Sequence, residues 1–403
     1  MINKNIFFKN ISFKSKRYLT NLNRTKFFFN SLKEDIHHLE TPLLKSFEKD
    51  YILDFDREVV KKFSKYKNII ILGMGGSVLG SQAIYSFFKK KIKKKVFFFD
   101  NLDFNIISNF EKIQNIKNSC FVVVSKSGNT LETITNFSFI LSKAQIMNNL
   151  VFITEMRDNA LMQLANKFNG EIIEHKKFIG GRFSVLSEVG MFPAALMGLN
   201  INKFKNFKQL VNNKNFSTAL IQNVASVYTL NSQKINNSVI FSYDSKLNGL
   251  SYWYQQLVAE SLGKNKKGIT PTISFGPRDH HSVLQLYLDG PKNKFFTFLS
   301  YKNNKSIKKI NSNAIPESLK FLKNKKLESV INAHCSAVLK VFNLKKIPFR
   351  HFIFNQNNEK EFGSIFTFFV LETILLAKLL NIDAFDQPAV EQVKIQTKNI
   401  LLK

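Results

Sequence analysis

The sequence predicts an α/β protein built from parallel sheets with helices on their faces. Short runs rich in Ile, Val and Phe end in small or polar clusters, and a stretch with helical spacing follows each run. The runs are apolar almost throughout, as expected of strands buried on both faces. They form two sets with a polar stretch at about residues 200–215 between them, so we predict two similar domains.

The elements are predicted in chain order. The first fifty residues and the last twenty-five have helical spacing and are expected to form an arm and a lid. The run at 365–380 is expected to be a buried amphipathic helix, because Glu372 and Lys378 would be costly inside a membrane. Predicted strands lie at 68–72, 96–99, 121–124, 150–153, 238–242, 295–301 and 349–354. The predicted division is a helical segment 1–54, a first domain 55–205 and a second domain 206–403.

Composition leaves several classes of partner open at first. The 403 residues include 59 Lys or Arg against 29 Asp or Glu, a formal net charge of +30, so an anionic partner has to be considered. The densest cluster, Lys89 to Lys95, is typical of a solvated helix end. No recognition helix, aromatic RNA-binding strand or zinc finger accompanies it, so no nucleic-acid partner and no membrane association are predicted.

Only two cysteines, Cys120 and Cys335, are present, and neither has a metal-ligand spacing around it. We therefore predict no disulfide framework and no metal site. Residues 1–33 are basic but lack an uninterrupted apolar core and a small-residue cleavage site, so a cytoplasmic location is predicted.

Glycine is rare, and four of the sixteen glycines follow the predicted strand 68–72, at Gly73, Gly75, Gly76 and Gly80. A strand-to-helix turn rich in glycine lets backbone N–H groups approach an anion. Val78 breaks the dinucleotide-binding fingerprint, and GxxxxGK[ST] does not occur. Tight packing of helix on strand remains the alternative explanation.

The next strand-to-helix junction carries a stronger signal. Four hydroxyl groups, an amide and a lysine crowd the first helical turn, where free N–H groups already favour negative charge. N-capping alone accounts for one such hydroxyl. The junction therefore predicts a phosphate-binding loop, with the residues Ser125, Lys126, Ser127, Asn129, Thr130 and Thr133.

The pattern SxSGxTxET at 125–133 resembles the sugar isomerase (SIS) domain, whose members bind phosphosugars in this loop. Further stretches at 178–184, 256–261, 281–286 and 385–394 resemble the glucose-6-phosphate isomerase family and follow its order along the chain. The resemblance implies two flavodoxin-like SIS domains, aldose-ketose isomerisation in glycolysis and gluconeogenesis, no cofactor, and a homodimer with active sites at the interface.

The residues support this chemistry independently. Moving a proton between adjacent sugar carbons needs a base and a group that stabilises an enediolate. Glu260 lies four residues after Gln256, so both emerge on one face of the helix predicted at 251–262. That helix is largely apolar, and a carboxylate there needs a purpose or a partner. Arg182 follows paired glycines, a setting that holds its charge close to the backbone.

The resemblance also implies individual roles. Arg182 would stabilise the intermediate, and His281 rather than His280 would open the sugar ring, reaching the site of the other subunit. Lys394 would assist ring opening, although Ala389 replaces the glycine of the family pattern beside it. Gln256 would position the substrate beside Glu260. The substrate-binding set is completed by Gly76, Ser77, Gly181, Ser125, the Lys126 backbone, Ser127 and Thr130.

Two other functions stay open at this stage. A dual phosphoglucose and phosphomannose isomerase shares the loop and also uses a Glu and a His. A non-catalytic sugar-phosphate sensor could keep the loop but would not need Glu260, Arg182 and His281 together. An aminosugar synthase would need an amino-terminal Cys nucleophile, whereas the first Cys here is Cys120.

Overall fold

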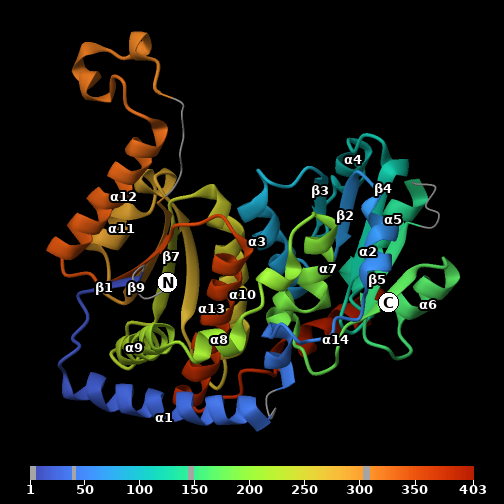
Figure 1. Ribbon diagram of the computed structural model, residues 1–403, viewed down its shortest axis with the longest axis horizontal. Helices are drawn as coiled ribbons and strands as arrows, with labels where there is room; N and C mark the ends of the chain where they lie inside the picture. The colour runs from blue at the N-terminus through green and yellow to red at the C-terminus, as the bar shows by residue number, and fades with distance from the viewer. Residues whose placement is uncertain (1–5, 39–41, 144–148, 303–308) are drawn as a thin grey trace.

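The computed structural model describes residues 6–38, 42–143, 149–302 and 309–403, and in it the strands form two five-stranded sheets (Figure 1). The first sheet is parallel, in the order β3-β2-β4-β5-β6. All but the edge strands β3 and β6 are buried along their whole length, as expected of strands covered on both faces. Its strands are β2 Asn68–Leu72, β3 Lys95–Phe99, β4 Ser119–Val124, β5 Leu150–Thr154 and β6 Glu171–Glu174.

The second sheet has the order β1-β10-β9-β7-β8. Four of its strands are parallel, and β1 joins the edge antiparallel to β10, with Ile6 opposite Phe352. Its strands are β1 Ile6–Lys9, β7 Asn237–Ser242, β8 Thr270–Phe275, β9 Lys294–Tyr301 and β10 Phe349–Phe354.

The two sheets share one strand order. Among the parallel strands of each sheet, the second along the chain lies on one side of the first, and the third and fourth lie on the other side. This is the flavodoxin-like doubly wound order, in which ligands bind beyond the carboxyl ends of the strands where the order reverses. The predicted fold class, two α/β domains with parallel sheets, is confirmed.

Three strands were not predicted. β6 is short and has a glutamate at each end, and β8 contains Pro271 and lies at a sheet edge, where proline is tolerated. β1 falls in the segment 1–54 predicted as helical, so that prediction is wrong for residues 6–9. The domain boundaries stay a prediction. The second sheet includes β1, which lies within the predicted segment 1–54 and not within the predicted second domain 206–403.

Fourteen α-helices lie in the described residues. α3 and α10 pack along one another between the two sheets, with α13 on the far side of α10 (Figure 1). The helices are α1 Lys16–His38, α2 Arg57–Ser64, α3 Leu79–Phe88, α4 Ile106–Glu111, α5 Leu131–Lys143, α6 Ala160–Lys167, α7 Glu188–Leu196, α8 Phe207–Val211, α9 Lys214–Asn231, α10 Asn248–Leu262, α11 Leu284–Asp289, α12 Leu327–Leu344, α13 Glu359–Leu380 and α14 Ala389–Leu401.

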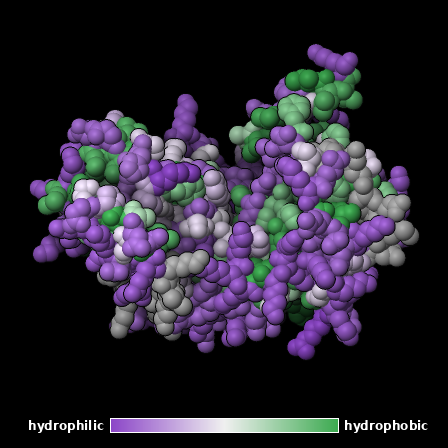
Figure 2. Space-filling model, turned by 90° about the horizontal axis from the view of Figure 1, so that it is seen from above, coloured by the Kyte–Doolittle hydropathy of each residue, from purple (hydrophilic) through white to green (hydrophobic). Residues whose placement is uncertain are grey.

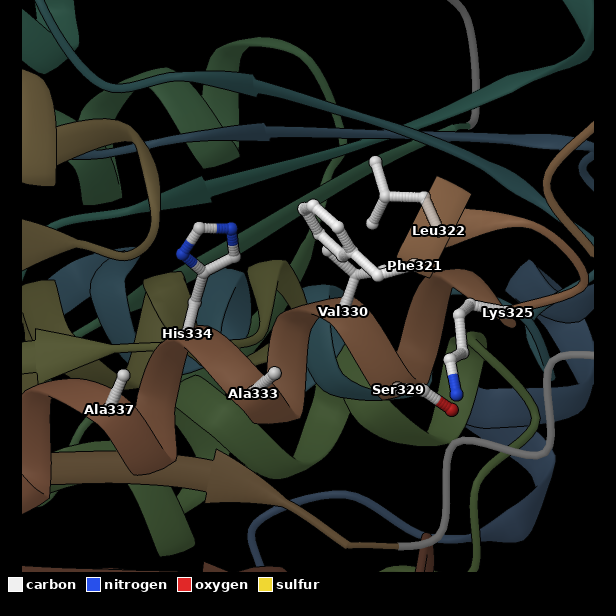
Figure 3. Close-up of a pocket in the computed structure, with 8 residues that line it drawn as sticks. All are labelled: Phe321, Leu322, Lys325, Ser329, Val330, Ala333, His334 and Ala337. Atoms are coloured by element: carbon white, nitrogen blue, oxygen red, sulfur yellow. The ribbon is translucent and has the colours of Figure 1, made fainter. Parts of the chain in front are cut away.

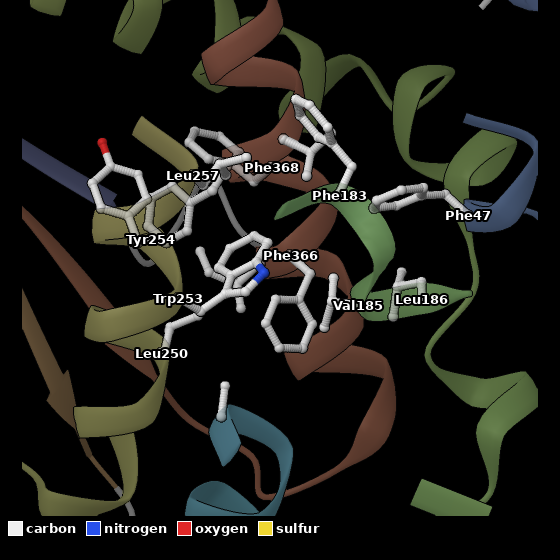
Figure 4. Close-up of a cluster of buried hydrophobic side chains, with 14 of the residues drawn as sticks. Phe47, Phe183, Val185, Leu186, Leu250, Trp253, Tyr254, Leu257, Phe366 and Phe368 are labelled. Atoms are coloured by element: carbon white, nitrogen blue, oxygen red, sulfur yellow. The ribbon is translucent and has the colours of Figure 1, made fainter. Parts of the chain in front are cut away.

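One hydrophobic core runs through both domains. Trp253 of α10 packs edge-on against Phe366 of α13, with ring centroids 4.7 Å apart, and Phe183 and Leu186 of the neighbouring 3-10 turn belong to the same cluster (Figure 4). Burying such large aromatic side chains contributes strongly to stability. The helix α10 is therefore fixed against elements of both domains.

Among the described residues, α13 is the one helix long and apolar enough to span a membrane by length and composition, but 94% of its apolar window is buried inside the protein. It contains the run 365–380, which was predicted to be a buried amphipathic helix and is buried almost throughout. The outer face shown in Figure 2 is largely hydrophilic, with hydrophobic residues in separate patches. Helix α14 has no buried residue.

Candidate active site

The two loops predicted to bind an anion meet at the carboxyl edge of the first sheet. They follow β2 and β4, which are adjacent strands at the point where the strand order reverses. The loops are in direct contact, since a Cβ added to Gly73 would lie 2.9 Å from the carbonyl oxygen of Val124. The strand order thus brings together two sequence motifs that lie about fifty residues apart.

The glycines after β2 allow close approach of three segments. A Cβ on Gly76 would lie 2.3 Å from the carbonyl carbon of Gly181, and one on Gly75, at φ +52°, would lie 2.8 Å from Nε2 of Gln256. A side chain at position 76 would collide with backbone, and one at position 75 would be strained by the positive φ. Tight packing, the alternative explanation of these glycines, therefore accounts for Gly76, and the same packing places the loop against Gly181 and Gln256.

The hydroxyl-rich loop precedes α5. Ser125 Oγ and Thr130 Oγ1 are hydrogen-bonded at 2.8 Å, and Ser127 Oγ accepts a 3.3 Å bond from the Asn129 N–H. Gly128 has φ +70°, and a Cβ there would overlap the amide of Asn159. The loop is therefore a tight turn that presents hydroxyl and N–H groups beside the first turn of a helix, the arrangement suited to a phosphate.

The Lys126 side chain is engaged elsewhere. Its Nζ donates to the carbonyl of Lys177 at 2.8 Å and lies 3.8 Å from Glu155. Burial lowers the pKa of Lys126, an effect that Glu155 counteracts and Arg182 reinforces. The Lys126 side chain is thus engaged with Lys177 and Glu155, and the role predicted for its backbone stays a prediction.

Glu260 lies near the carboxyl end of α10 and is held at both oxygens. Its Oε1 accepts a 2.8 Å bond from Gln256 Nε2, one helical turn earlier, and its Oε2 lies 3.4 Å from Arg182 Nη1. Its side chain is 31% exposed, whereas that of Arg182 is 2% exposed. A carboxylate is therefore presented to a cavity from an otherwise buried face.

Arg182 is clamped in place by two separate segments. It donates to Ser261 Oγ at 2.8 Å and Gln387 Oε1 at 2.9 Å, and to the carbonyls of Asp386, at 2.9 Å, and Ala384. Burial lowers the pKa of Arg182, and the neighbouring Glu260 counteracts this. A guanidinium remains charged in either case, so the site holds one fixed cation beside one carboxylate.

A cavity of about 560 Å³ opens beside Glu260. The sequence singled out the stretch at 385–394 but assigned a role only to Lys394. The structure brings the Gln387 side chain and the Asp386 carbonyl of this stretch to Arg182, together with the carbonyl of Ala384 just before it. The sequence Phe-Asp-Gln at 385–387 was the signal from which the role of Gln387 could have been predicted. The cavity is lined by Ala259, Glu260, Gly263, Lys264, Asn265, Asp383, Asp386, Gln387, Pro388, Ala389 and Val390.

In the described residues of one chain, no hydrogen bond or ion pair joins Glu260 to His281 or Lys394, two of the predicted catalytic residues. Strand β8 runs antiparallel to α10, because Gln255 Nε2 bonds the Pro271 carbonyl and Tyr252 contacts Phe275. The turn holding His281 follows Phe275, so it lies beyond the amino end of α10, whereas Glu260 lies about 12 Å further along the helix from Tyr252.

Lys394 lies on the exposed helix α14, and its Nζ is 3.0 Å from Glu391 of the same helix. It is not among the residues that line the cavity. Its predicted part in ring opening stays a prediction.

A second cavity, of about 470 Å³, lies between α12 and the segment 317–322 (Figure 3). Its lining is mainly apolar, and Figure 3 shows His334 at one end and Phe321 and Leu322 facing it. No paired acid and base lines it, so it is not the candidate for proton transfer. In the described part of the chain, no group of three or more His, Cys, Asp or Glu could hold a metal ion.

Two flavodoxin-like sheets, a hydroxyl-rich loop at a switch point and a carboxylate held beside a buried arginine define a phosphosugar isomerase of the SIS type. Residues 52–403 match the family model described as phosphoglucose isomerase. The chain belongs to the phosphoglucose isomerase family.

Individual relatives agree with this assignment. Glucose-6-phosphate isomerase of Methanocaldococcus jannaschii is 32% identical over 362 residues, covering 86% of this chain and 87% of the relative. The enzyme of the same name from Campylobacter jejuni is 32% identical over 372 residues, covering 87% and 89%. A hypothetical protein from Thermus thermophilus shares the fold with a TM-score of 0.83 at 20% identity, covering 99% of this chain and all of the other.

Proposed function

We propose that the protein interconverts glucose 6-phosphate and fructose 6-phosphate with Glu260 as the base. The observation that carries this proposal is the placement of Glu260 between Gln256 and Arg182, at the rim of a cavity and close to the glycine-rich loop. Family membership supplies the reaction, and the geometry supplies a proton acceptor with a cation next to it.

The proposed reaction consists of substrate binding, ring opening and a series of proton transfers. The phosphate binds the loops after β2 and β4, through Gly76, Ser77 and the hydroxyl-rich turn. After ring opening, Glu260 removes the proton from C2 of the aldose, and the electrons move into an enediolate whose negative charge Arg182 stabilises. The proton of the C2 hydroxyl passes to the C1 oxygen, and Glu260 then returns its own proton to C1, giving the ketose with its carbonyl at C2. The steps exchange protons only, so no redox cofactor takes part.

Gln256 and Gly181 shape the same corner of the site. Gln256 Nε2 donates to the Glu260 carboxylate and touches the position of Gly75, so it connects the base to the phosphate-binding side. We assign Gln256 the positioning of substrate and base, and Gly181 the close contact that lets the two loops meet.

We further propose a homodimer in which His281 enters the site of a second copy of the chain, with Lys394 close to it. The distance along α10 between the His281 turn and Glu260 supports an arrangement across subunits, as does the fully exposed helix α14 beyond the cavity. Two buried free cysteines, Cys120 and Cys335, suit the cytoplasmic location that we propose.

The experiment is an isomerase assay coupled to a dehydrogenase. Glu260→Gln and His281→Gln are each expected to lower kcat by about 10² to 10⁴ when measured alone, the usual contribution of an acid or base. Mixing and re-associating the two variants restores activity in hybrid dimers, because one of the two sites then has both residues intact. Full activity of Glu260→Gln alone would show that Glu260 is not the base. Failure of the hybrids to recover activity would show that the active site is not shared between subunits.

A further inference from the structure

The turn that carries His281 is firmly anchored at the carboxyl edge of the second sheet. The Gly276 N–H donates to the Ser242 carbonyl at 2.8 Å, and the Phe275 N–H donates to Asp279 Oδ2 at 2.8 Å. Asp279 is only 8% exposed. The turn, Arg278–His281, is thus tied by backbone and side-chain bonds to the ends of β7 and β8.

A partly buried hydrogen bond anchors the residue next to His281. Tyr243 follows β7, is 3% exposed, and its Oη lies 2.6 Å from Nε2 of His280. Its ring lies directly under the turn, since a Cβ on Gly276 would be 2.4 Å from Tyr243 Cε1. The phenol therefore fixes both the position of the turn and the orientation of the His280 ring.

The surroundings of His280 favour the neutral form of its imidazole. It contacts the ring of His334 on α12 at 5.5 Å, and burial lowers the pKa of His280, with smaller contributions in the same direction from His334 and His281. Asp279 acts in the opposite direction. Of the two adjacent histidines, His280 is held inside by Tyr243, whereas His281 is exposed.

We propose that the Tyr243–His280 pair positions His281 for ring opening. His281 is a single residue beyond an imidazole that is fixed to the sheet, so its own backbone is presented in one orientation. The proposal rests on the ring-opening role proposed for His281. Tyr243 and His280 touch no substrate and act through their neighbour.

The expected effect of Tyr243→Phe is that of losing one hydrogen bond. Tyr243→Phe removes one hydroxyl and changes no volume at the packed ring, so the fold is retained. Loss of the bond frees the His280 ring, and a small displacement of a positioned catalytic group lowers the rate by about 10- to 100-fold. Tyr287→Phe is the matched control, because it removes a 2.7 Å hydrogen bond to Ser274 Oγ in the same domain without touching His280.

Two substrates separate positioning from general damage. Fructose 6-phosphate closes its ring through the C5 hydroxyl, so 5-deoxyfructose 6-phosphate stays open and needs no ring opening. For Tyr243→Phe we expect kcat on fructose 6-phosphate to fall at least about tenfold. We expect deuterium exchange at C1 of the open analogue to keep its wild-type rate. Tyr287→Phe changes neither.

Equal losses on both substrates, or no loss on either, would overturn the proposal. His281→Gln measured in parallel shows which level fails. If His281→Gln selectively impairs the ring-closed substrate and Tyr243→Phe does not, the positioning role alone is wrong. If His281→Gln shows no such selectivity, the ring-opening role falls, and the positioning role falls with it.

Discussion

Two buried arginine-glutamate pairs in this protein serve different ends. Glu260 lines the cavity at the carboxyl end of α10 and has Arg182 beside it, whereas Arg350 and Glu372 lie inside the second domain. Both guanidinium groups are almost fully buried, with side chains 2% exposed. The carboxylates differ, since the side chain of Glu260 is 31% exposed and that of Glu372 is 0% exposed.

The inner pair, Arg350 and Glu372, has hydrogen-bond partners on every side, unlike the outer pair, Arg182 and Glu260. Arg350 Nη1 lies 2.5 Å from Glu372 Oε2, and its other nitrogens donate to Thr297 Oγ1 at 2.8 Å and Tyr254 Oη at 2.9 Å. Tyr254 donates to Glu372 at 2.7 Å, and Asn223 bonds both partners. These residues come from β9, β10, α9, α10 and α13, so the network joins one sheet to the helices on its face.

The difference teaches how to tell a structural pair from a chemical one. A network in which every group is satisfied fixes the packing and leaves no group for a ligand. At Glu260, the contact to Arg182 is longer, at 3.4 Å, and the carboxylate remains accessible. A buried cation that holds its carboxylate only loosely can instead direct its charge to a reacting molecule.

Breaking the inner pair has the largest expected effect on stability. Glu372→Leu leaves Arg350 buried without its counter-charge, so we expect the free energy of unfolding to fall by about 3–5 kcal/mol. The measurement is urea unfolding followed by circular dichroism. The kcat per folded molecule stays near the wild-type value.

The double variant Arg350→Met/Glu372→Leu is the control, since it removes both charges and is expected to recover most of the loss. A single variant as stable as the wild type would show that the inner pair does not hold the domain together.

Breaking the outer pair affects catalysis instead. Arg182→Gln removes the fixed charge beside the enediolate, and we expect kcat to fall by about 10² to 10³, the usual size for one stabilising donor. KM changes less, because the substrate phosphate binds elsewhere. Steady-state kinetics in the coupled assay measure both values, and Lys208→Met, which breaks an exposed ion pair with Asp50 outside the cavity lining, is the comparison variant. An unchanged kcat would show that the outer pair, like the inner one, has no catalytic role.

Acid weakens both regions to a similar and smaller extent, because each contains one buried histidine. Burial lowers the pKa of His175, beside Lys126, and that of His351, next to Arg350, to about 4. Since the folded pKa lies below the ordinary value of about 6.5, the unfolded chain binds the proton first as pH falls. Stability is therefore lost between pH 6.5 and 4, at pH 5 by about 2 kcal/mol for each histidine.

Urea unfolding at pH 7 and pH 5 measures this loss, and His175→Gln and His351→Gln are each expected to flatten the pH dependence. If both variants kept the wild-type slope, neither histidine would be the titrating group.

The sequence alone predicts the outer pair better than the inner one. Glu260 and Gln256 are four residues apart on one helix, and Arg182 lies in a short glycine motif, so local patterns reveal them. Arg350 lies in a strand that is otherwise largely apolar, and its partners Asn223 and Tyr254 lie 127 and 96 residues away. Such a network depends on tertiary packing and leaves no local signal.

The same distinction explains what was missed elsewhere. The hydrogen bond between Gln387 and Arg182 spans 205 residues. The edge strand β1 pairs with β10, which is remote in the sequence, and the edge strand β8 pairs in parallel with β7. The predicted phosphate loops, in contrast, were visible because glycine and hydroxyl residues cluster in the turns themselves. What the sequence could not reveal was that the His281 turn and Glu260 lie toward opposite ends of α10.

The central claim is that Glu260 carries the proton between the two carbons. The most direct test is deuterium incorporation at C2 of glucose 6-phosphate, followed by NMR in D₂O, with the wild-type protein and with Glu260→Gln, each at saturating substrate. We predict rapid incorporation with the wild type and a loss of about 10² to 10⁴ in its rate with the variant, while the fold is unchanged. Incorporation at the wild-type rate in Glu260→Gln would contradict the claim.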